Sequence, residues 1–227
     1  MSAHRNRRFW DRIAQRYAAR PLKDVPAYDA MLAATSAHLR ATDRVLELGC
    51  GTGGTAIHLA PKVAQWVATD FSGEMVRIAQ SKPGADGVTF KMADARHALE
   101  DGPFDAICAF NLLHLVEDMP ELLARIHSSL RPDGLLICRT WCFADVKLWV
   151  RALFVVLRVF GMFPVATSLS VGQLRQALAD AGFEIVEQRI FGAYAQNPFI
   201  VARKTGGRRD LPQIQDILST TDSRSMN

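Results

Sequence analysis

A glycine-rich loop that directly follows a short apolar run constrains the fold of this chain most strongly. Residues 44–48 predict a buried strand, and Gly49, Gly51 and Gly53 then occupy every second position. Glycine lets the backbone turn sharply and approach a ligand closely, because it has no Cβ. A helix predicted over 55–59 presents free N–H groups and a positive dipole end to that ligand. These elements predict the first half of a nucleoside-binding βαβ unit.

The second half of this unit ends in an acidic residue. The apolar run 66–69 predicts the next strand, and Asp70 at its end is placed to accept hydrogen bonds from ribose hydroxyls. Gly49, Gly51 and Gly54 also fit the dinucleotide pattern G-x-G-x-x-G, so an NAD-dependent oxidoreductase is an alternative interpretation. Glu47, two residues before the first glycine, favours a different ligand, because a carboxylate there suits a cation such as an amino group.

Alternating helices and strands extend beyond this unit. The remaining strands are predicted at 88–92, 104–110, 135–140, 183–191 and 198–203. Helices are predicted at 6–18, 27–39, 73–81, 120–130 and 171–181, and a turn is predicted at 131–134. Helices between consecutive strands are typical of a parallel sheet, whereas the last two strands form an antiparallel hairpin.

The phrase Glu47-Leu-Gly-Cys-Gly-Thr-Gly53 closely resembles the first motif of the class I S-adenosylmethionine-dependent methyltransferases. The resemblance covers about residues 9–203 and is greatest to the small-molecule branch, which includes ubiquinone and menaquinone biosynthesis methyltransferases. It implies a doubly wound, Rossmann-like α/β fold with a seven-stranded, mostly parallel sheet, an antiparallel C-terminal hairpin and an N-terminal helical cap. It also implies S-adenosylmethionine as cofactor and S-adenosylhomocysteine as product.

The same resemblance and the βαβ pattern give the expected cofactor-binding residues. They are Tyr17, Glu47, Gly49, Cys50, Gly51, Gly53, Asp70, Phe71, Met75, Asp94, Ala95 and Asn111. In related enzymes an acid at the position of Asp94 hydrogen-bonds the adenine amino group. Phe71 and Met75 either press on the ribose or adenine or belong to the core. The Tyr17 hydroxyl either reaches the methionine carboxylate or the substrate, or its ring packs on the core.

Residues 110–114 follow the fourth strand and lie where parallel strands end at the ligand crevice. The Asn-Pro-Pro-Tyr pattern of nucleobase amino-methyltransferases is absent here, which argues against methylation of DNA. His114 and Tyr17 are the catalytic candidates. His114 ordinarily titrates in a range that suits proton removal from a hydroxyl or amine, although a packed histidine is the alternative.

Residues 143–168 depart from the family pattern and predict an apolar helix over 148–165. Lys147, Arg151 and Arg158 fall within about 40° of one another on that helix. Three interpretations stay open: a lid over the active site, a helix on a membrane surface, or a subunit interface. The first two favour a small, apolar acceptor, or a membrane lipid or quinone. A protein that binds the cofactor without catalysis is a further alternative.

The net charge of +4 lies in the chain ends, and this limits the partners. Residues 1–24 carry seven basic and two acidic side chains, and 203–227 carry five and three. The remainder is therefore acidic overall, so no nucleic-acid partner is expected. The four cysteines have no metal-ligand spacing and predict reduced thiols, no metal site and a cytoplasmic protein. We expect a helical cap over 1–40, a core over 41–204 and a polar tail over 205–227; the pattern specifies no oligomeric state.

Overall fold

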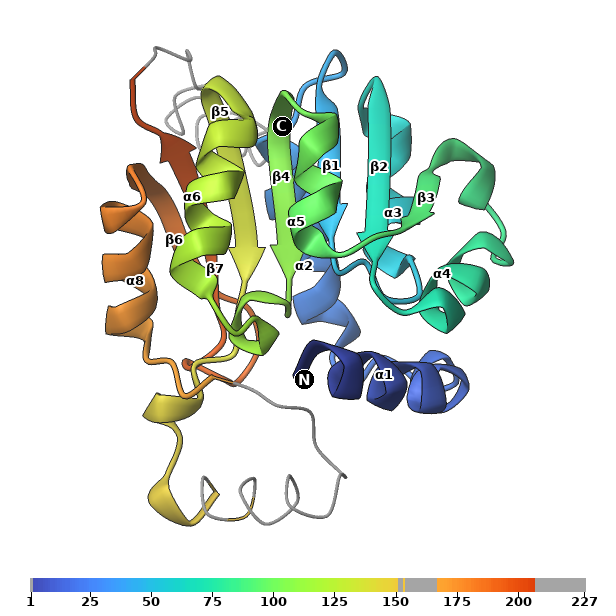
Figure 1. Cartoon of the computed structure of the whole chain (residues 1–227), viewed down its shortest axis with the longest axis horizontal. Helices are drawn as coiled ribbons and strands as arrows, with labels where there is room; N and C mark the ends of the chain where they lie inside the picture. Colours follow the sequence, from blue (N-terminus) through green and yellow to red (C-terminus); the bar gives the residue numbers. More distant parts are fainter. Residues whose placement is uncertain (1, 151–152, 154–166, 207–227) are drawn as a thin grey trace, which may run out of the picture.

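Seven strands form one sheet in the order β3-β2-β1-β4-β5-β7-β6 (Figure 1). The computed structural model describes residues 2–150, 153 and 167–206. Strands β1 to β5 pair in parallel, and β7 pairs antiparallel with both β5 and β6. The strands are β1 (Arg44–Leu48), β2 (Gln65–Asp70), β3 (Thr89–Met92), β4 (Phe104–Phe110), β5 (Leu130–Arg139), β6 (Phe183–Ile190) and β7 (Pro198–Lys204).

Helices cover both faces of the sheet. They are α1 (Ser2–Ala18), α2 (Val25–Ala37), α3 (Gly54–Leu59), α4 (Gly73–Gln80), α5 (Ala95–Ala98), α6 (Met119–Ser129) and α8 (Val171–Asp180). Apolar residues of α6 and α8 pack on one face, and those of α2, α3 and α4 pack on the other. Because both faces are covered, β1 and β4 are almost continuously apolar and buried.

Side-chain caps begin the helices where the sequence predicts them. Ser72 accepts a hydrogen bond from the backbone N–H of Met75 at the start of α4. Ser170 and Gln173 form a reciprocal capping box at the start of α8. These caps satisfy N–H groups that have no partner within the helix, so they define where each helix begins.

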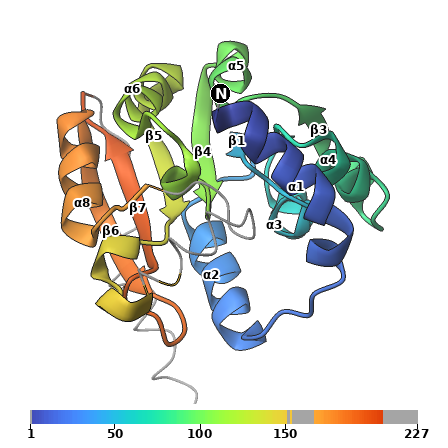
Figure 2. The ribbon, with the colours of Figure 1, turned by 60° about the horizontal axis from the view of Figure 1, so that its bottom comes forward.

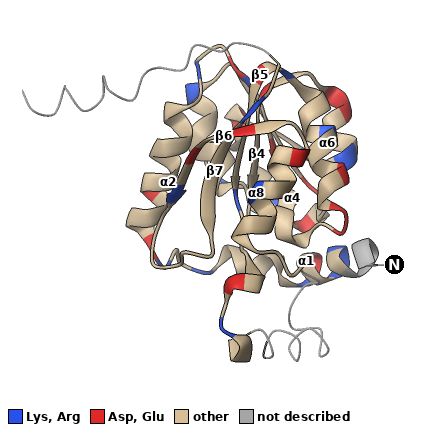
Figure 3. Ribbon diagram, turned by 90° about the vertical axis from the view of Figure 1, so that its left-hand side faces the viewer, with Lys and Arg blue, Asp and Glu red and all other residues tan. Residues whose placement is uncertain are grey.

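Two segments lie at the end of the sheet where the parallel strands finish. Helix α1 crosses this end on the β1–β2 side, and residues 143–150 project from it on the β5 side (Figure 2). Lys and Arg residues of α1 therefore lie at the same end of the molecule as the 143–150 segment (Figure 3). The two segments bracket the strand ends that a nucleoside-binding fold uses for its ligand.

The predicted doubly wound fold is confirmed, with local differences. Helix α1 begins at Ser2 instead of residue 6, helix α5 was not predicted, and β5 is longer than expected. Residues 131–134, predicted as a turn, belong to β5, which begins at Leu130. Phe104 pairs with Leu130 and Ala106 with Leu135, so the intervening residues bulge out of the register. Asp133 in this bulge has a φ of 60°. The turn-forming residues thus produce a bulge within the strand, and pairing with β4 extends the strand on both sides of it.

Most of the predicted helix at 148–165 lies outside the described residues. Residues 148–150 are helical. Two backbone hydrogen bonds hold the described ends of this region in place. Ala144 N donates to Leu169 O, which joins the two ends, and Thr167 N donates to His114 O after β4. In the part of the chain that the structure describes, no helix is long and apolar enough to cross a membrane.

Candidate active site

The glycine loop connects β1 to α3 at the C-terminal edge of the sheet. Gly49, Gly51 and Gly53 have φ values of 67°, 54° and 75°, in the left-handed region that favours glycine. At Gly53 an added Cβ would lie 2.7 Å from Phe90 Cζ and 2.9 Å from Ala79 Cβ. The loop therefore packs tightly against α4 and β3 on this side. At Gly51 the nearest atom to an added Cβ is Tyr17 Cε1 at 4.0 Å, which places Tyr17 beside the loop.

Asp70 joins the glycine loop to the start of α4. One carboxylate oxygen accepts a hydrogen bond from Gly51 N at 2.9 Å, and the other accepts one from Ser72 N at 2.9 Å. Burial raises the pKa of Asp70, while these two backbone donors oppose the shift. Because an ionised carboxylate offers about four acceptor positions, Asp70 keeps capacity for further donors such as ribose hydroxyls.

Glu47 is 2% exposed, and its Oε2 accepts a hydrogen bond from Trp66 Nε1 at 3.2 Å. Burial is the main cause that raises the pKa of Glu47 to about 8, and the nearby charge of Asp70 adds to it. At neutral pH this carboxyl group is therefore mostly protonated. A cationic ligand beside it would favour the ionised form.

Tyr17 on α1 lies beside the glycine loop and also lines a cavity between α1 and the segment 141–150. Its ring contacts Trp10 edge-to-face, with the centroids 6.0 Å apart. Although 44% of Tyr17 is exposed, burial of its hydroxyl, followed by the charge of Asp70, raises its pKa. The hydroxyl is consequently a hydrogen-bond donor at neutral pH, as its predicted contact with a carboxylate requires.

The other predicted cofactor residues follow the ends of β1, β2 and β3. Cys50 is buried, and its backbone N–H donates to Thr69 O at 2.9 Å. Phe71 is half-buried, whereas Met75 is buried in a small cluster with Ala14 of α1. Their ligand contacts stay predictions, and the packing of Met75 beneath α1 is the core alternative.

Asp94 and Ala95 lie at the start of α5. Asp94 is exposed, and its Oδ1 accepts a hydrogen bond from Arg96 N at 2.9 Å. Its side chain therefore caps the short helix, and the predicted hydrogen bond to an adenine amino group would use the remaining acceptor positions. Ala95 is half-buried and packs against the core.

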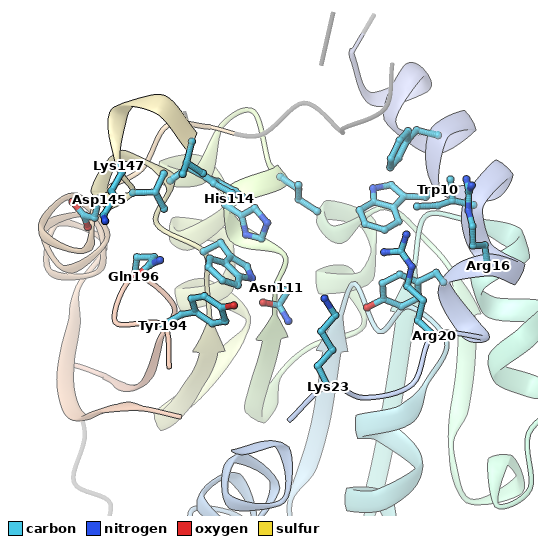
Figure 4. A pocket seen from close by; sticks show the side chains of 18 of the residues that line it. Trp10, Arg16, Arg20, Lys23, Asn111, His114, Asp145, Lys147, Tyr194 and Gln196 are labelled. Atoms are coloured by element: carbon cyan, nitrogen blue, oxygen red, sulfur yellow. The ribbon is translucent and has the colours of Figure 1, made fainter. Parts of the chain in front are cut away.

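A cavity of about 1440 Å³ opens beside the glycine loop, between α1 and the segment 141–150 (Figure 4). The apolar side chains of α1 line one side; they are Phe9, Trp10, Ile13 and Tyr17. Asn111 and His114 line the floor after β4. Aromatic side chains form much of the walls; they are Phe9, Trp10, Tyr17, Trp141, Phe143, Trp149 and Tyr194.

His114 is 5% exposed and borders the cavity. Its ring contacts Phe143 at a centroid distance of 5.4 Å, and its buried Nδ1 has no hydrogen-bond partner among the described residues. Burial lowers the pKa of His114 from the ordinary 6.5 to about 4. The expectation that this histidine titrates near neutral pH is therefore wrong, because its surroundings disfavour the charged form. Its role as a base stays a prediction.

The structure adds cavity residues that sequence reasoning missed. Trp141 follows β5 and Tyr194 lies between β6 and β7, yet their ring centroids are 5.3 Å apart. Arg20 and Lys23 enter from the connection between α1 and α2. No motif links these positions, because three separate segments supply them. The basic character of residues 1–24 was the available signal for the two cations.

Fold and site together define a class: an α/β protein with a nucleoside-binding edge and a large aromatic cavity beside it. A family model described as "Methyltransferase domain" matches residues 2–188. The chain belongs to this methyltransferase family, and the family predicted from its motifs is confirmed.

Relatives and solved structures are similar over parts of their length. A hybrid PKS-NRPS synthetase from Fusarium sp. is 32% identical over 124 residues, 50% of this chain and 3% of the relative. Malonyl-[acyl-carrier protein] O-methyltransferase from Bacillus cytotoxicus is 33% identical over 101 residues, 43% of this chain and 35% of the relative. The chain thus spans about a third or less of these two proteins.

A solved magnesium protoporphyrin IX methyltransferase from Synechocystis, with bound SAH, has a TM-score of 0.61 and 23% identity. That likeness covers 87% of this chain and 93% of that protein. At this identity the comparison supports the fold alone.

Proposed function

We propose that this protein transfers the methyl group of S-adenosylmethionine to an oxygen, nitrogen or carbon nucleophile of a small, largely apolar molecule. The observation that carries the proposal is the placement of Asp70, which binds Gly51 N and Ser72 N at the mouth of the glycine loop. In a chain of the methyltransferase family, a carboxylate beside the glycine loop is suited to accept hydrogen bonds from ribose hydroxyls.

The residues present fit the cofactor. Without a Cβ at Gly51, space remains between the loop and Tyr17, where a side chain would otherwise intrude. Asp70 and Asp94 retain acceptor positions for sugar hydroxyls and an exocyclic amino group, respectively. The cofactor, when bound, supplies a methyl group made electrophilic by the sulfonium charge.

The protein's own residues would hold the cofactor and the acceptor in position and exclude water from the cavity. Helix α1 lies over the strand ends and is held to α4 by a 2.6 Å hydrogen bond from Ser72 Oγ to Asp11. The aromatic walls exclude water from an acceptor in the cavity, and orientation of two bound reactants can supply much of the rate. His114 is a weak base at a pKa of about 4, so an acceptor that is already nucleophilic fits the site best.

Radiolabelled S-adenosylmethionine tests the proposal. We expect the wild-type protein to transfer label to a member of a panel of carboxylic acids, phenols, quinols and amines. The Asp70→Ala variant should transfer none. Asp86→Ala, which removes an exposed acid from the turn after α4, is the matched control and should retain activity. Cofactor binding without transfer to any acceptor would instead support a non-catalytic cofactor-binding protein.

A second candidate is that the acceptor is a lipid or quinone taken from a bilayer surface. Leu148 and Trp149 are 76% and 68% exposed, and they adjoin the cationic Lys147. An apolar surface flanked by a cation suits the headgroup region of a membrane. We expect the protein to co-sediment with anionic liposomes. The double variant Leu148→Ser, Trp149→Ser should co-sediment less. Unchanged sedimentation would remove this candidate.

A further inference from the structure

Resting on the proposed function, we propose that the methyl acceptor is an amphipathic anion. Its apolar body would lie against the aromatic walls of the cavity, and Arg20 and Lys23 would hold its negatively charged group. This narrows the acceptor class, because apolar size alone would equally admit alcohols and amines.

The charges that line the cavity carry the first step. Five of the described lining residues are cationic, namely Arg12, Arg16, Arg20, Lys23 and Lys147, whereas Asp145 is the single acid among them. Like charges gathered at a cavity repel one another and create a positive potential within it. An anionic ligand relieves that repulsion, and a cationic amine increases it.

The two acids near these cations, Asp145 and Asp24, each accept a hydrogen bond from the backbone at the start of a helix. Asp145 Oδ2 accepts a hydrogen bond from Val171 N at 2.7 Å, at the start of α8. Asp24, next to Lys23 in the chain, accepts one from Ala27 N at 3.1 Å and caps α2. In the described part of the chain, neither Arg20 nor Lys23 forms an ion pair with a carboxylate. Both cations are therefore available to a ligand.

The direction of the side chains carries the second step. Arg20 and Lys23 extend into the open space from the α1 side, toward Asn111 and His114 (Figure 4). His114 and the hydroxyl of Tyr194 face them across the cavity. His114 stays uncharged at neutral pH, and Lys147 lies beside Asp145 on the opposite side (Figure 4). The excess positive charge of the lining is therefore on the side of Arg20 and Lys23.

The shape of the cavity completes the assignment. Its aromatic walls offer broad apolar surface, while Arg20 and Lys23 provide hydrogen-bond donors and charge at one side. A ligand with an apolar chain or ring system and one carboxylate or phosphate matches both features. Arg suits a carboxylate or phosphate especially well, because its planar guanidinium can donate two parallel hydrogen bonds.

Three probes of equal chain length test this assignment: decanoate, decanol and decylammonium. Tryptophan fluorescence reports their binding directly, because Trp10, Trp141 and Trp149 line the cavity. With saturating S-adenosylhomocysteine, wild type should bind decanoate at least about tenfold tighter than decylammonium. Arg20→Gln and Lys23→Gln should each weaken decanoate binding about tenfold and leave decanol binding unchanged.

Arg8→Gln is the matched control, since Arg8 is exposed on α1 and does not line the cavity. It removes the same charge and should leave decanoate binding unchanged. Equal binding of the three probes, or an equal loss in Arg8→Gln, would overturn the assignment by showing no charge selection or only a diffuse surface field. Calorimetry with S-adenosylhomocysteine on the same samples separates the failures: absent cofactor binding contradicts the proposed function, whereas normal cofactor binding without anion preference contradicts only this inference.

Discussion

The two sides of the candidate site are built differently. On the glycine-loop side, neighbouring strand ends supply Gly49, Gly51 and Asp70, and the Asp70 carboxylate accepts hydrogen bonds from Gly51 N and Ser72 N. On the cavity side, separate segments supply side chains such as Trp141 and Lys23, which meet only in the folded molecule. The first side is constrained by backbone geometry and the second by side-chain chemistry.

This contrast separates a part of the site that backbone geometry constrains from a part that depends on individual side chains. A loop whose backbone conformation favours glycine tolerates few substitutions. A cavity made from side chains of α1 and residues 141–150 can change its acceptor through a few substitutions. A change on one side of the site should therefore leave the other side intact.

Gly53→Ala should have the largest effect. The new Cβ would lie 2.7 Å from Phe90 Cζ while the backbone keeps a φ of 75°. Left-handed strain and overpacking together should lower the free energy of unfolding by about 2 to 4 kcal/mol and abolish cofactor binding. Urea denaturation measures the first effect and calorimetry the second. Gly87→Ala is the control, because an added Cβ there meets nothing within 4 Å; equal stability of the two variants would contradict the packing account.

His114→Gln should change how stability depends on pH. Because the folded pKa is about 4 and the ordinary value is 6.5, the unfolded chain binds the proton more readily in this interval. Wild type should therefore lose up to about 3 kcal/mol as the pH falls from 6.5 to 4, and this loss should be absent in the variant. Above pH 6.5 the histidine contributes no pH dependence.

Urea denaturation at several pH values measures this difference. His97→Gln, which removes an exposed histidine, should retain the wild-type pH dependence. Parallel stability profiles for wild type and His114→Gln would show that His114 is not buried in its neutral form. Cofactor affinity at pH 7 should be the same in all three proteins, since the perturbation lies on the cavity side.

Asp70→Asn should weaken S-adenosylhomocysteine binding about tenfold to a hundredfold, because hydrogen bonds to a charged acceptor are lost. Decanoate binding in the cavity should be unchanged, since Asp70 does not line it. Calorimetry and tryptophan fluorescence measure the two affinities. Loss of both would indicate that the variant disturbs the whole site, and the division into two sides would then fail.

Glu47 gives the smallest and most specific effect. Its pKa of about 8 means that the carboxyl group is mostly protonated at pH 7. If the cofactor amino group binds beside it, binding should release up to about one proton. Calorimetry in buffers of different ionisation enthalpy measures this release, which Glu47→Gln should abolish. Equal heats in all buffers would leave Glu47 as a buried partner of Trp66 without a ligand role.

Residues with a single dominant constraint were predictable from the sequence. The bounds of β1 and β4 match their predicted ranges, because both strands are buried on both faces and their apolar runs end abruptly. The glycine loop was predictable because only glycine adopts its backbone conformation readily. The starts of α4 and α8 match the predicted helices at 73–81 and 171–181, because short polar side chains such as Ser72 and Ser170 preferentially begin helices.

Features that depend on tertiary structure were not predictable in this way. Helix α5 has four residues, too few for a periodic pattern, and begins at the cap Asp94. The low pKa of His114 arises from burial that follows only from the packing of residues distant in sequence. The cavity lining combines α1, the β4 end and residues 141–150, none of which indicates the others.

Calorimetric titration of the wild-type protein with S-adenosylhomocysteine and, separately, with NADH tests the central claim most directly. The account predicts binding of S-adenosylhomocysteine at a single site and no heat with NADH. Binding of NADH without binding of S-adenosylhomocysteine would contradict it, because the glycine loop and Asp70 would then serve a dinucleotide.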